Sequence, residues 1–411
     1  MENLAINGGK PVRTKPFPSW PVVGEEERNN LLEVLESKKW GYGEKAKEFE
    51  EKFAAFQDAQ YGITCTNGTA ALEVCLLSLG IGAGNEVIVP PYTFVATASA
   101  VLRVNAIPIF ADIDLKTANL DPVDTEKKIT EETKAIIPVH FAGLPADMDA
   151  FHQLAKKHNL KIIEDACHSW GSKWKNKGTG ALGDCSAFSF QRSKNITAGE
   201  GGIILTDNKE IADTARSFTN CGRGKDKPWY EHYLLGSNLR LTEFQAAILL
   251  AQLTRLESQV LKREENAKYL NEKLKEIPGL KIVDSDDPRI TRRSYHLYLV
   301  RYLKEEWNNI PREKFLSALN AEGIPAYSGY PQPLYQNPLF LRKGKGPKFC
   351  PLSCPYYGKE VDYSKVSCPN AERICKEAVW LRHSVLLADK EDMDEIITAV
   401  KKVRENIDRI T

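Results

Sequence analysis

Between residues 61 and 206 the sequence alternates short β runs with helical stretches, and this alternation is the strongest constraint on its fold. The β runs cover residues 86–89, 107–110, 135–139, 161–164, 187–190 and 202–205. The helical stretches between most of them cover residues 69–79, 93–102, 148–158 and 210–218. Such alternation builds a mainly parallel sheet with helices on both faces. The sequence therefore predicts an α/β fold, with ligands bound beyond the carboxyl ends of the strands.

The C-terminal part of the sequence has a different pattern. A long helix is predicted from residue 242 onward, because apolar residues recur there at helical spacing: Ala247, Leu250, Leu253, Leu256 and Val260. It leads into a second unit with a β run at 295–300 and an amphipathic C-terminal helix. We therefore expect a large domain over residues 1–260, which starts with an extended arm, and a small α+β domain over residues 261–411.

The composition excludes several classes of protein. The 411 residues carry a net charge of only +1, so there is no electrostatic footprint for nucleic acid. The longest apolar runs are too short to span a bilayer. The start, Met1-Glu2-Asn3, has neither the basic region nor the apolar core of a secretory signal. The nine cysteines are odd in number and scattered, which favours reduced thiols in a cytoplasmic protein.

A metal centre is the other chemistry that the cysteines could support. Four of them lie near the C-terminus: Cys350, Cys354, Cys368 and Cys375. Their spacing matches no paired zinc pattern, so we expect no metal there.

The segment from Ser189 to Gly202 holds a single lysine in a polar turn between two β runs. The glycines that follow the lysine let the backbone fold tightly around whatever it faces. A lysine held over a pocket at a strand end loses hydration, and burial favours the neutral, nucleophilic amine that Schiff-base chemistry requires. The alternative is an ordinary solvated turn lysine. Lys194 is therefore a candidate for covalent catalysis.

Residues 65–72 have the pattern of a tight turn that opens a helix. Backbone N–H groups at a helix start, with a threonine hydroxyl beside them, form a site for phosphate. An ordinary helix N-cap is the alternative. The segment is not a P-loop, because no Gly-Lys-Ser/Thr follows. Residues 80–84 also miss the dinucleotide fingerprint, since Asn85 stands in place of its third glycine.

Two further strand ends carry side chains suited to a flat heteroaromatic ring. Phe94 follows the run 86–89, where an aromatic side chain can stack on such a ring; a core phenylalanine is the alternative. Asp165 follows the run 161–164, and a buried carboxylate needs a partner such as a protonated pyridine nitrogen. A helix cap is the alternative for Asp165, and a core histidine is the alternative for His168.

A phosphate cradle, a stacking aromatic ring, a carboxylate for a pyridine nitrogen and a Schiff-base lysine thus fall in order at successive strand ends. Pyridoxal phosphate uses this combination better than any other cofactor. We therefore predict that the protein binds pyridoxal phosphate.

Five motifs make a resemblance to a known family specific. They are Thr-Asn-Gly-Thr-Ala-Ala-Leu at 66–72, Pro-Tyr-Thr-Phe at 91–94, Glu-Asp-Ala at 164–166, the lysine segment at 189–202 and Gly-Ser-Asn-Leu-Arg at 236–240. The chain resembles the DegT/DnrJ/EryC1/StrS sugar aminotransferases. The resemblance implies the type I fold of pyridoxal-phosphate-dependent transferases, which is the fold of aspartate aminotransferase. It also implies a homodimer with shared active sites.

The resemblance also implies roles for individual residues. Gly68 and Thr69 would hold the phosphate of the cofactor, with Ser189 near it. Phe94 would stack on the ring. Asp165 would meet the pyridine nitrogen.

Three more roles follow from the same resemblance. His168 takes the place where the family often has glutamine against the other face of the ring, and Lys194 would bond covalently to the cofactor. Asn238 resembles the residue that reaches the phosphate from the neighbouring subunit; a surface loop is the alternative. Gln191 stands where the family commonly has histidine. With residues 378–383, this pattern resembles the branch of scyllo-inosose aminotransferases and 3-amino-5-hydroxybenzoate synthases.

We therefore predict an aminotransferase that moves an amino group from glutamate or glutamine to a keto-sugar or keto-cyclitol. One alternative is a dehydratase of the same fold that uses pyridoxal or pyridoxamine phosphate; the resemblance implies a histidine in place of the lysine there, so Lys194 argues against it. Another is a non-catalytic regulatory protein that kept the fold, which the retained cofactor positions argue against. A nicotinamide-dependent oxidoreductase lacks support, because the glycine fingerprint is missing.

Overall fold

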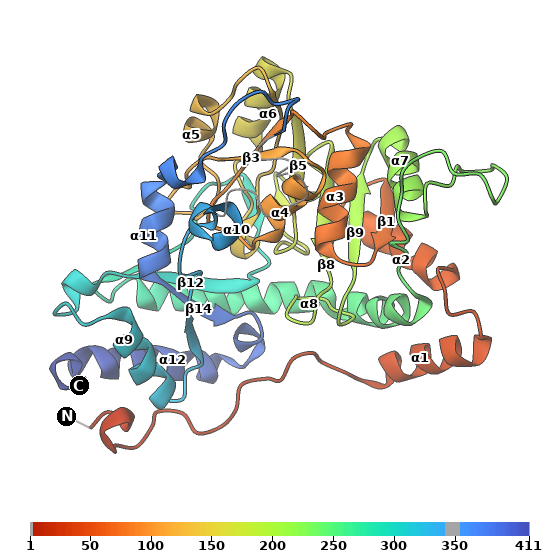
Figure 1. Ribbon diagram of the computed structural model, residues 1–411. Helices are drawn as coiled ribbons and strands as arrows, with labels where there is room; N and C mark the ends of the chain where they lie inside the picture. The colour runs from red at the N-terminus through yellow and green to blue at the C-terminus, as the bar shows by residue number, and fades with distance from the viewer. Residues whose placement is uncertain (1–2, 342–353, 411) are drawn as a thin grey trace.

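The computed structural model describes residues 3–341 and 354–410, which form a large central sheet, two smaller antiparallel sheets and the helices around them (Figure 1). The strands are β1 (Tyr61–Cys65), β2 (Glu86–Val89), β3 (Ile107–Phe110), β4 (Thr133–Ile136), β5 (Lys161–Asp165), β6 (Lys173–Trp174), β7 (Lys177–Gly178), β8 (Cys185–Ser189), β9 (Gly202–Thr206), β10 (Leu280–Ile282), β11 (Ile290–Arg292), β12 (Leu297–Tyr302), β13 (Ala326–Ser328) and β14 (Ala378–Arg382). The α-helices are α1 (Glu25–Ser37), α2 (Glu44–Phe56), α3 (Gly68–Ser78), α4 (Ala96–Arg103), α5 (Pro122–Lys127), α6 (Met148–His158), α7 (Lys209–Thr219), α8 (Glu243–Leu274), α9 (Arg312–Ala321), α10 (Pro338–Leu341), α11 (Pro369–Glu377) and α12 (Lys390–Glu405).

The central sheet has seven strands in the order β1-β9-β8-β5-β4-β2-β3. Neighbours from β8 to β3 pair in parallel, because a helix or a long crossover returns the chain before each next strand. Strand β9 pairs antiparallel with β8, since no helix separates the two in the chain. Strand β1 pairs antiparallel with β9. The α/β fold with a mainly parallel sheet, predicted from the sequence, is confirmed.

Helices cover both faces of the central sheet. Alternate residues of β8 point to opposite faces: Ala187 belongs to the apolar cluster that contains α3, and Phe188 belongs to the cluster that contains α2 and α8. Because α3 packs against β8, β9, α4 and α7, its sequence is apolar on nearly all sides. On the other face, Phe53 of α2 meets Phe188 edge to face with ring centres 5.2 Å apart.

A second unit forms around the antiparallel sheet β10-β12-β14-β13. Its apolar residues pack with the C-terminal half of α8 and with α9 and α12. In Figure 1 the long green helix α8 runs below the central sheet and continues into the second unit, where β12 and β14 lie beside it and α9 and α12 lie below it. The domain boundary expected at residue 260 falls inside this continuous helix, and the division into 1–260 and 261–411 stays a prediction.

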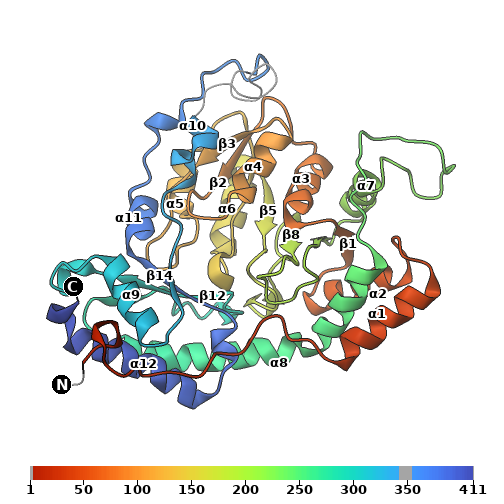
Figure 2. The same ribbon diagram turned by 60° about the horizontal axis from the view of Figure 1, so that its bottom comes forward.

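The N-terminal arm, residues 3–24, runs along the second unit before it reaches α1 (Figure 2). Leu4 is buried in the apolar cluster of that unit, and Arg13 forms an ion pair with Asp392 of α12 at 2.7 Å. Trp20 meets the ring of His383 edge-on, with ring centres 4.6 Å apart. The arm therefore joins the start of the chain to its C-terminal third.

Two elements differ from their sequence predictions by three residues at one end. The β run expected at 135–139 ends with β4 at Ile136, because the chain turns through a short 3-10 helix at Phe141–Gly143, and Val139 pairs with Asp165 in an isolated bridge. The helix expected from residue 93 begins at Ala96, after the turn that holds Phe94. Among the described residues, no helix is long and apolar enough to cross a membrane.

Candidate active site

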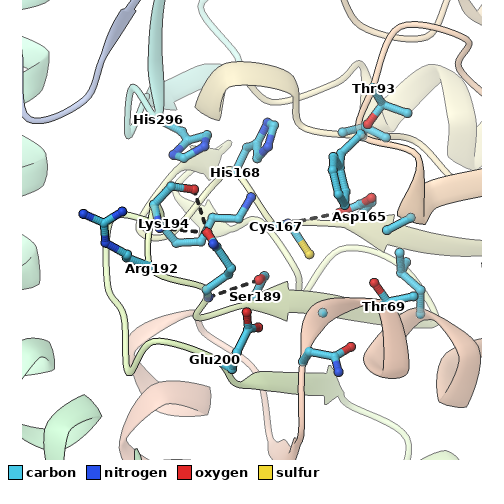
Figure 3. Close-up of a pocket in the computed structure, with 18 of the residues that line it drawn as sticks. Thr69, Thr93, Asp165, Cys167, His168, Ser189, Arg192, Lys194, Glu200 and His296 are labelled. Atoms are coloured by element: carbon cyan, nitrogen blue, oxygen red, sulfur yellow. Dashed lines mark hydrogen bonds between the residues drawn. The ribbon is translucent and has the colours of Figure 1, made fainter. Parts of the chain in front are cut away.

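Four segments that follow strands of the central sheet line one cavity of about 1030 Å³. They are the start of α3 after β1, the turn with Phe94 after β2, Asp165 at the end of β5 and the turn with Lys194 after β8. The carboxyl ends of parallel strands share one edge of a sheet. Strand β1 ends there too, because it is antiparallel to β9, which is antiparallel to β8. Figure 3 shows Asp165 and Lys194 converging on this cavity.

Seven of the eight site residues predicted from the sequence line this cavity: Gly68, Thr69, Phe94, Asp165, His168, Ser189 and Lys194.

The backbone of the turn places Lys194 at the cavity. The Lys194 N–H donates to the carbonyl of Gln191 at 2.9 Å. Gly199 and Gly201 have φ angles of +82° and +153°, a region that glycine alone enters without steric cost. The glycines predicted to shape the turn therefore do so at these two positions.

The side chain of Lys194 is half-buried, and its Nζ lies 5.7 Å from the centre of the Trp170 ring. Burial lowers the pKa of this amine, and the nearby Cys167 and Asp165 partly oppose the shift. A lowered pKa increases the fraction of neutral, nucleophilic amine at neutral pH. This environment differs from that of a solvated turn lysine.

Asp165 is buried at the end of β5, with 5% of its surface exposed. Its Oδ2 accepts a hydrogen bond from the Thr97 hydroxyl at 2.7 Å, and its Oδ1 accepts one from the Cys167 N–H at 3.2 Å. Within residues 3–341 and 354–410 it forms no ion pair with a cation. A buried carboxylate is costly without such a partner, so a protonated pyridine nitrogen would complete its surroundings.

The start of α3 presents free backbone donors to the cavity. Asn67 caps the helix by accepting the Ala70 N–H at 2.9 Å. The N–H groups of the two preceding residues, Gly68 and Thr69, have no acceptor in the part of the chain that the structure describes. A Cβ atom at Gly68 would lie 2.8 Å from Cβ of Ser189, so the close approach requires glycine. Such a helix start suits a phosphate.

Phe94 and His168 provide two flat side chains at the same cavity. Phe94 is 56% exposed and therefore is not a core residue. His168 is buried, and its Nδ1 accepts the Ala142 N–H at 3.4 Å. Burial, reinforced by the charge of Lys194, holds the pKa of His168 well below its ordinary value. The imidazole is therefore neutral, with its proton on Nε2.

Comparison with known proteins shows which family this chain belongs to. Residues 21–354 match the DegT/DnrJ/EryC1/StrS aminotransferase family. The chain belongs to this family. The L-glutamine:scyllo-inosose aminotransferase of Streptomyces griseus is 36% identical to it, over 100% of this chain and 99% of the relative.

Solved structures of this aminotransferase family share the fold. The crystal structure of 3-amino-5-hydroxybenzoic acid synthase aligns with a TM-score of 0.84 and 34% identity, over 97% of this chain and 100% of that chain. NtdA from Bacillus subtilis, with bound cofactor PMP, aligns with a TM-score of 0.81 and 26% identity, over 96% of this chain and 86% of that chain. The protein is a pyridoxal-phosphate-dependent aminotransferase of the type I fold.

Asn238, the eighth predicted residue, does not line the cavity of its own chain. It is exposed and forms an isolated bridge with Asn220. It follows a loop, residues 222–237, that projects beyond α7 in Figure 1. Trp229 and Leu235 of this loop are 72% and 97% exposed. The next residue, Leu239, does line the cavity.

A row of three histidines beside the cavity was not found by sequence reasoning. The rings of His168 and His296 are 4.4 Å apart between centres, and those of His296 and His383 are 5.7 Å apart. His383 donates from Nε2 to the carbonyl of Ser193, next to Lys194, at 3.1 Å. No local sequence motif contains the three histidines. The sequence signal that could have indicated them is that His296 directly precedes β12 and His383 directly follows β14.

Hydrogen bonds fix the tautomer of the middle histidine. Asn195 donates from Nδ2 to the carbonyl of Ser294 at 3.1 Å, so its Oδ1 accepts the proton on Nδ1 of His296 at 2.9 Å. Nε2 of His296 is therefore an acceptor. Burial, together with the neighbouring positive and histidine groups, lowers the pKa of His296 and of His383 well below the ordinary value. The row is neutral at pH 7.

The cysteine group near the C-terminus lies partly outside the described residues, since Cys350 falls in the segment 342–353. Cys354, Cys368 and Cys375 are buried free thiols. Within the described ranges, no group of three or more histidine, cysteine, aspartate or glutamate residues could hold a metal ion.

Proposed function

We propose that this aminotransferase moves an amino group from glutamine or glutamate to the ketone of a cyclitol or sugar. The observation that carries the proposal is the meeting of a half-buried lysine and a buried, cation-free carboxylate in one cavity. The 36% identical scyllo-inosose aminotransferase, named for L-glutamine as donor, favours glutamine and a cyclitol.

The cavity offers a fitting contact to each part of pyridoxal phosphate. We assign the phosphate to the start of α3, at Gly68 and Thr69, with Ser189 beside it. Phe94 and His168 would flank the pyridine ring. When bound, the cofactor supplies a protonated ring that withdraws electrons from the carbon that loses its proton.

Lys194 and Asp165 would then perform the chemistry. Lys194 would hold the cofactor covalently at rest. Once released by the amino donor, its amine would take the proton from the donor carbon and deliver it to the C4′ carbon of the cofactor. Its lowered pKa keeps a larger fraction of the amine ready to accept that proton. The negative charge of Asp165, oriented by the Thr97 hydroxyl, keeps the ring nitrogen protonated.

The decisive test uses the absorbance of the purified protein. We expect a yellow protein whose visible band borohydride bleaches, leaving a reduced adduct that peptide mapping finds on Lys194. Lys194→Ala is the control and should give neither band nor adduct. A colourless protein that takes up no added pyridoxal phosphate would contradict the proposed function and favour the non-catalytic regulatory protein. A panel of scyllo-inosose, nucleotide-linked keto-sugars and aminodehydroquinate identifies the ketone.

We also propose a homodimer in which Asn238 serves the site of its partner, as the family resemblance implies; Asn238 is not among the residues that line the cavity of its own chain. Mixing an inactive Lys194→Ala chain with an inactive Asn238→Ala chain should then restore activity. In each mixed dimer one site receives both intact residues and the other receives neither. Exchanging subunits that stay inactive would argue against a shared site, provided each parent alone is inactive.

A cytoplasmic location is part of the proposal. All eight described cysteines are free, as expected for a protein in a reducing compartment. Fractionation of the producing cells tests this point.

A further inference from the structure

The residue that follows Lys194 is hydrogen-bonded to the second unit. Asn195 is buried, with 1% of its surface exposed. Its Nδ2 donates to the carbonyl of Ser294 at 3.1 Å, and its Oδ1 accepts the Nδ1 proton of His296 at 2.9 Å. Because His296 directly precedes β12, these bonds join the lysine turn to the second sheet.

The residue that precedes Lys194 is held by a second histidine. The carbonyl of Ser193 accepts a hydrogen bond from Nε2 of His383 at 3.1 Å, and His383 directly follows β14. Nδ1 of His383 accepts from Nη2 of Arg263, which is fully buried, at 3.3 Å. A neutral imidazole has one donor and one acceptor nitrogen. Arg263 therefore keeps the proton of His383 on Nε2, where it reaches Ser193.

These three bonds are the hydrogen bonds that join residues 191–197 to distant parts of the chain. In the ranges 3–341 and 354–410, the other hydrogen bonds of these residues have both partners within 189–199. For example, the Gln191 side chain accepts the Ser193 N–H at 2.8 Å, and the Arg192 N–H donates to the carbonyl of Gly199 at 2.8 Å. Such local bonds give the turn its shape but do not anchor it against the second unit.

We propose that His296 and His383 are positioning residues for Lys194. Each holds one neighbour of the lysine, so together they set the place from which its amine meets the cofactor and the substrate carbon. This proposal rests on the proposed function, in which that amine carries a proton between two carbon atoms. Such a transfer depends steeply on geometry, and a displacement of about 1 Å can lower a rate about 100-fold.

The test uses variants that remove the hydrogen bonds or keep them without the ring. His296→Leu and His383→Leu remove the bonds. In His296→Asn the amide nitrogen takes the place of Nδ1, and in His383→Gln it takes the place of Nε2, so the bonds to the lysine turn are kept. His152→Leu is the matched control. Nε2 of His152 also bonds a carbonyl, that of Leu182 at 2.7 Å, but at an exposed position on α6.

The enzyme loaded with pyridoxal phosphate should lose rate without losing affinity for the donor. The half-reaction with L-glutamine is followed by the loss of the visible cofactor band. Each leucine variant of the two histidines should lower the maximal rate constant ~10–100-fold, while the glutamine concentration at half-maximal rate stays within about threefold of wild type. His296→Asn and His383→Gln should recover most of the rate, and His152→Leu should match wild type.

Hydrogen–deuterium exchange of the apoenzyme gives a readout that needs neither cofactor nor turnover. The amides of residues 191–197 should exchange about 3–10-fold faster in His296→Leu and His383→Leu than in wild type, because each variant has lost one hydrogen bond of the turn. Peptides from β8 and α6 should exchange as in wild type. His296→Asn and His383→Gln should restore the slow exchange of the turn.

A double-variant cycle tests the same bond from its other partner and serves also if His296→Leu does not fold. Asn195→Ala removes the acceptor of the His296 proton, so it should lower the rate constant about as much as His296→Leu. The variant with both substitutions should be no slower than Asn195→Ala alone, since the bond is already missing. Losses that multiply in the double variant would show that His296 does not act through Asn195.

Two further results would overturn the proposal. One is a wild-type rate and wild-type exchange in both leucine variants. The other is slow exchange restored in His296→Asn and His383→Gln while their rates stay as low as those of the leucine variants, because the rings would then act directly on the ligand. If the exchange results are as expected but the loaded wild-type enzyme reacts with no amino donor, the proposed function alone is contradicted.

Discussion

Replacing Glu164 with glutamine should destabilise the protein by about 3–5 kcal/mol. Glu164 is fully buried in β5, directly before Asp165. Its carboxylate accepts hydrogen bonds from Nε2 of His140 at 2.8 Å and from the N–H groups of Gly180, Leu182 and Gly183 at 2.7 Å each. This residue therefore ties the strand that carries Asp165 to the turn at 180–183.

The magnitude follows from which donors face which oxygen. Gly180 and His140 share Oε2, and His140 has its proton on Nε2 because its Nδ1 accepts the Ala146 N–H at 3.0 Å. The amide nitrogen of glutamine in that place would face two donors. Each buried donor left without an acceptor costs about 1–3 kcal/mol, so the two together account for the expected loss.

The pH dependence has a defined sign. Burial alone would raise the pKa of Glu164, but the hydrogen bonds from His140 and the backbone outweigh it and place the pKa below its ordinary value. The ionised carboxylate thus stabilises the fold above the unfolded-state pKa of about 4.3. That contribution is lost as the pH falls through the lower folded-state pKa.

The assay is urea unfolding at pH 7 followed by circular dichroism, for wild type and Glu164→Gln. Glu126→Gln is the control, because Glu126 is exposed and pairs with Lys157 at the surface, and it should leave the midpoint unchanged. A free energy of unfolding for Glu164→Gln within about 1 kcal/mol of wild type would refute the reasoning.

Three further predictions concern the cavity. Asp165→Asn should keep the fold but reduce kcat by ~100-fold or more, because a neutral amide cannot hold the ring nitrogen protonated; a wild-type kcat would show that the ring lies elsewhere. Gly68→Ala should weaken cofactor affinity by ~1–3 kcal/mol, since its Cβ would lie 2.8 Å from Cβ of Ser189; titration of the apoenzyme measures this, and an unchanged dissociation constant would contradict the phosphate site. The rate of the donor half-reaction should rise with pH and level off below pH 10.5, because burial lowers the pKa of Lys194; a rate that still rises above that pH would count against Lys194 as the base.

The residues that sequence reasoning located share a local signature. Asp165 is an acid directly after an apolar run, and Lys194 is a lone lysine in a glycine-rich turn between two strands. A parallel sheet converts such local patterns into a common site, because every strand ends at the same edge. The antiparallel β8–β9 pair could also be read from the sequence, since no helical stretch separates the runs at 187–190 and 202–205.

The residues that it did not locate are defined by contacts between distant segments. Thr97 donates to Asp165 across 68 residues, and His383 donates to Ser193 across 190 residues. Neither pair leaves a periodic pattern in its own segment.

The two units contribute different properties to the site. The contacts assigned to pyridoxal phosphate within one chain all lie at or just after the ends of strands of the central sheet. The second sheet adds residues to the same cavity, among them His296 before β12, Tyr327 in β13 and Arg382 at the end of β14. Substitutions in the second sheet can therefore change this part of the cavity lining while the residues assigned to the cofactor stay intact.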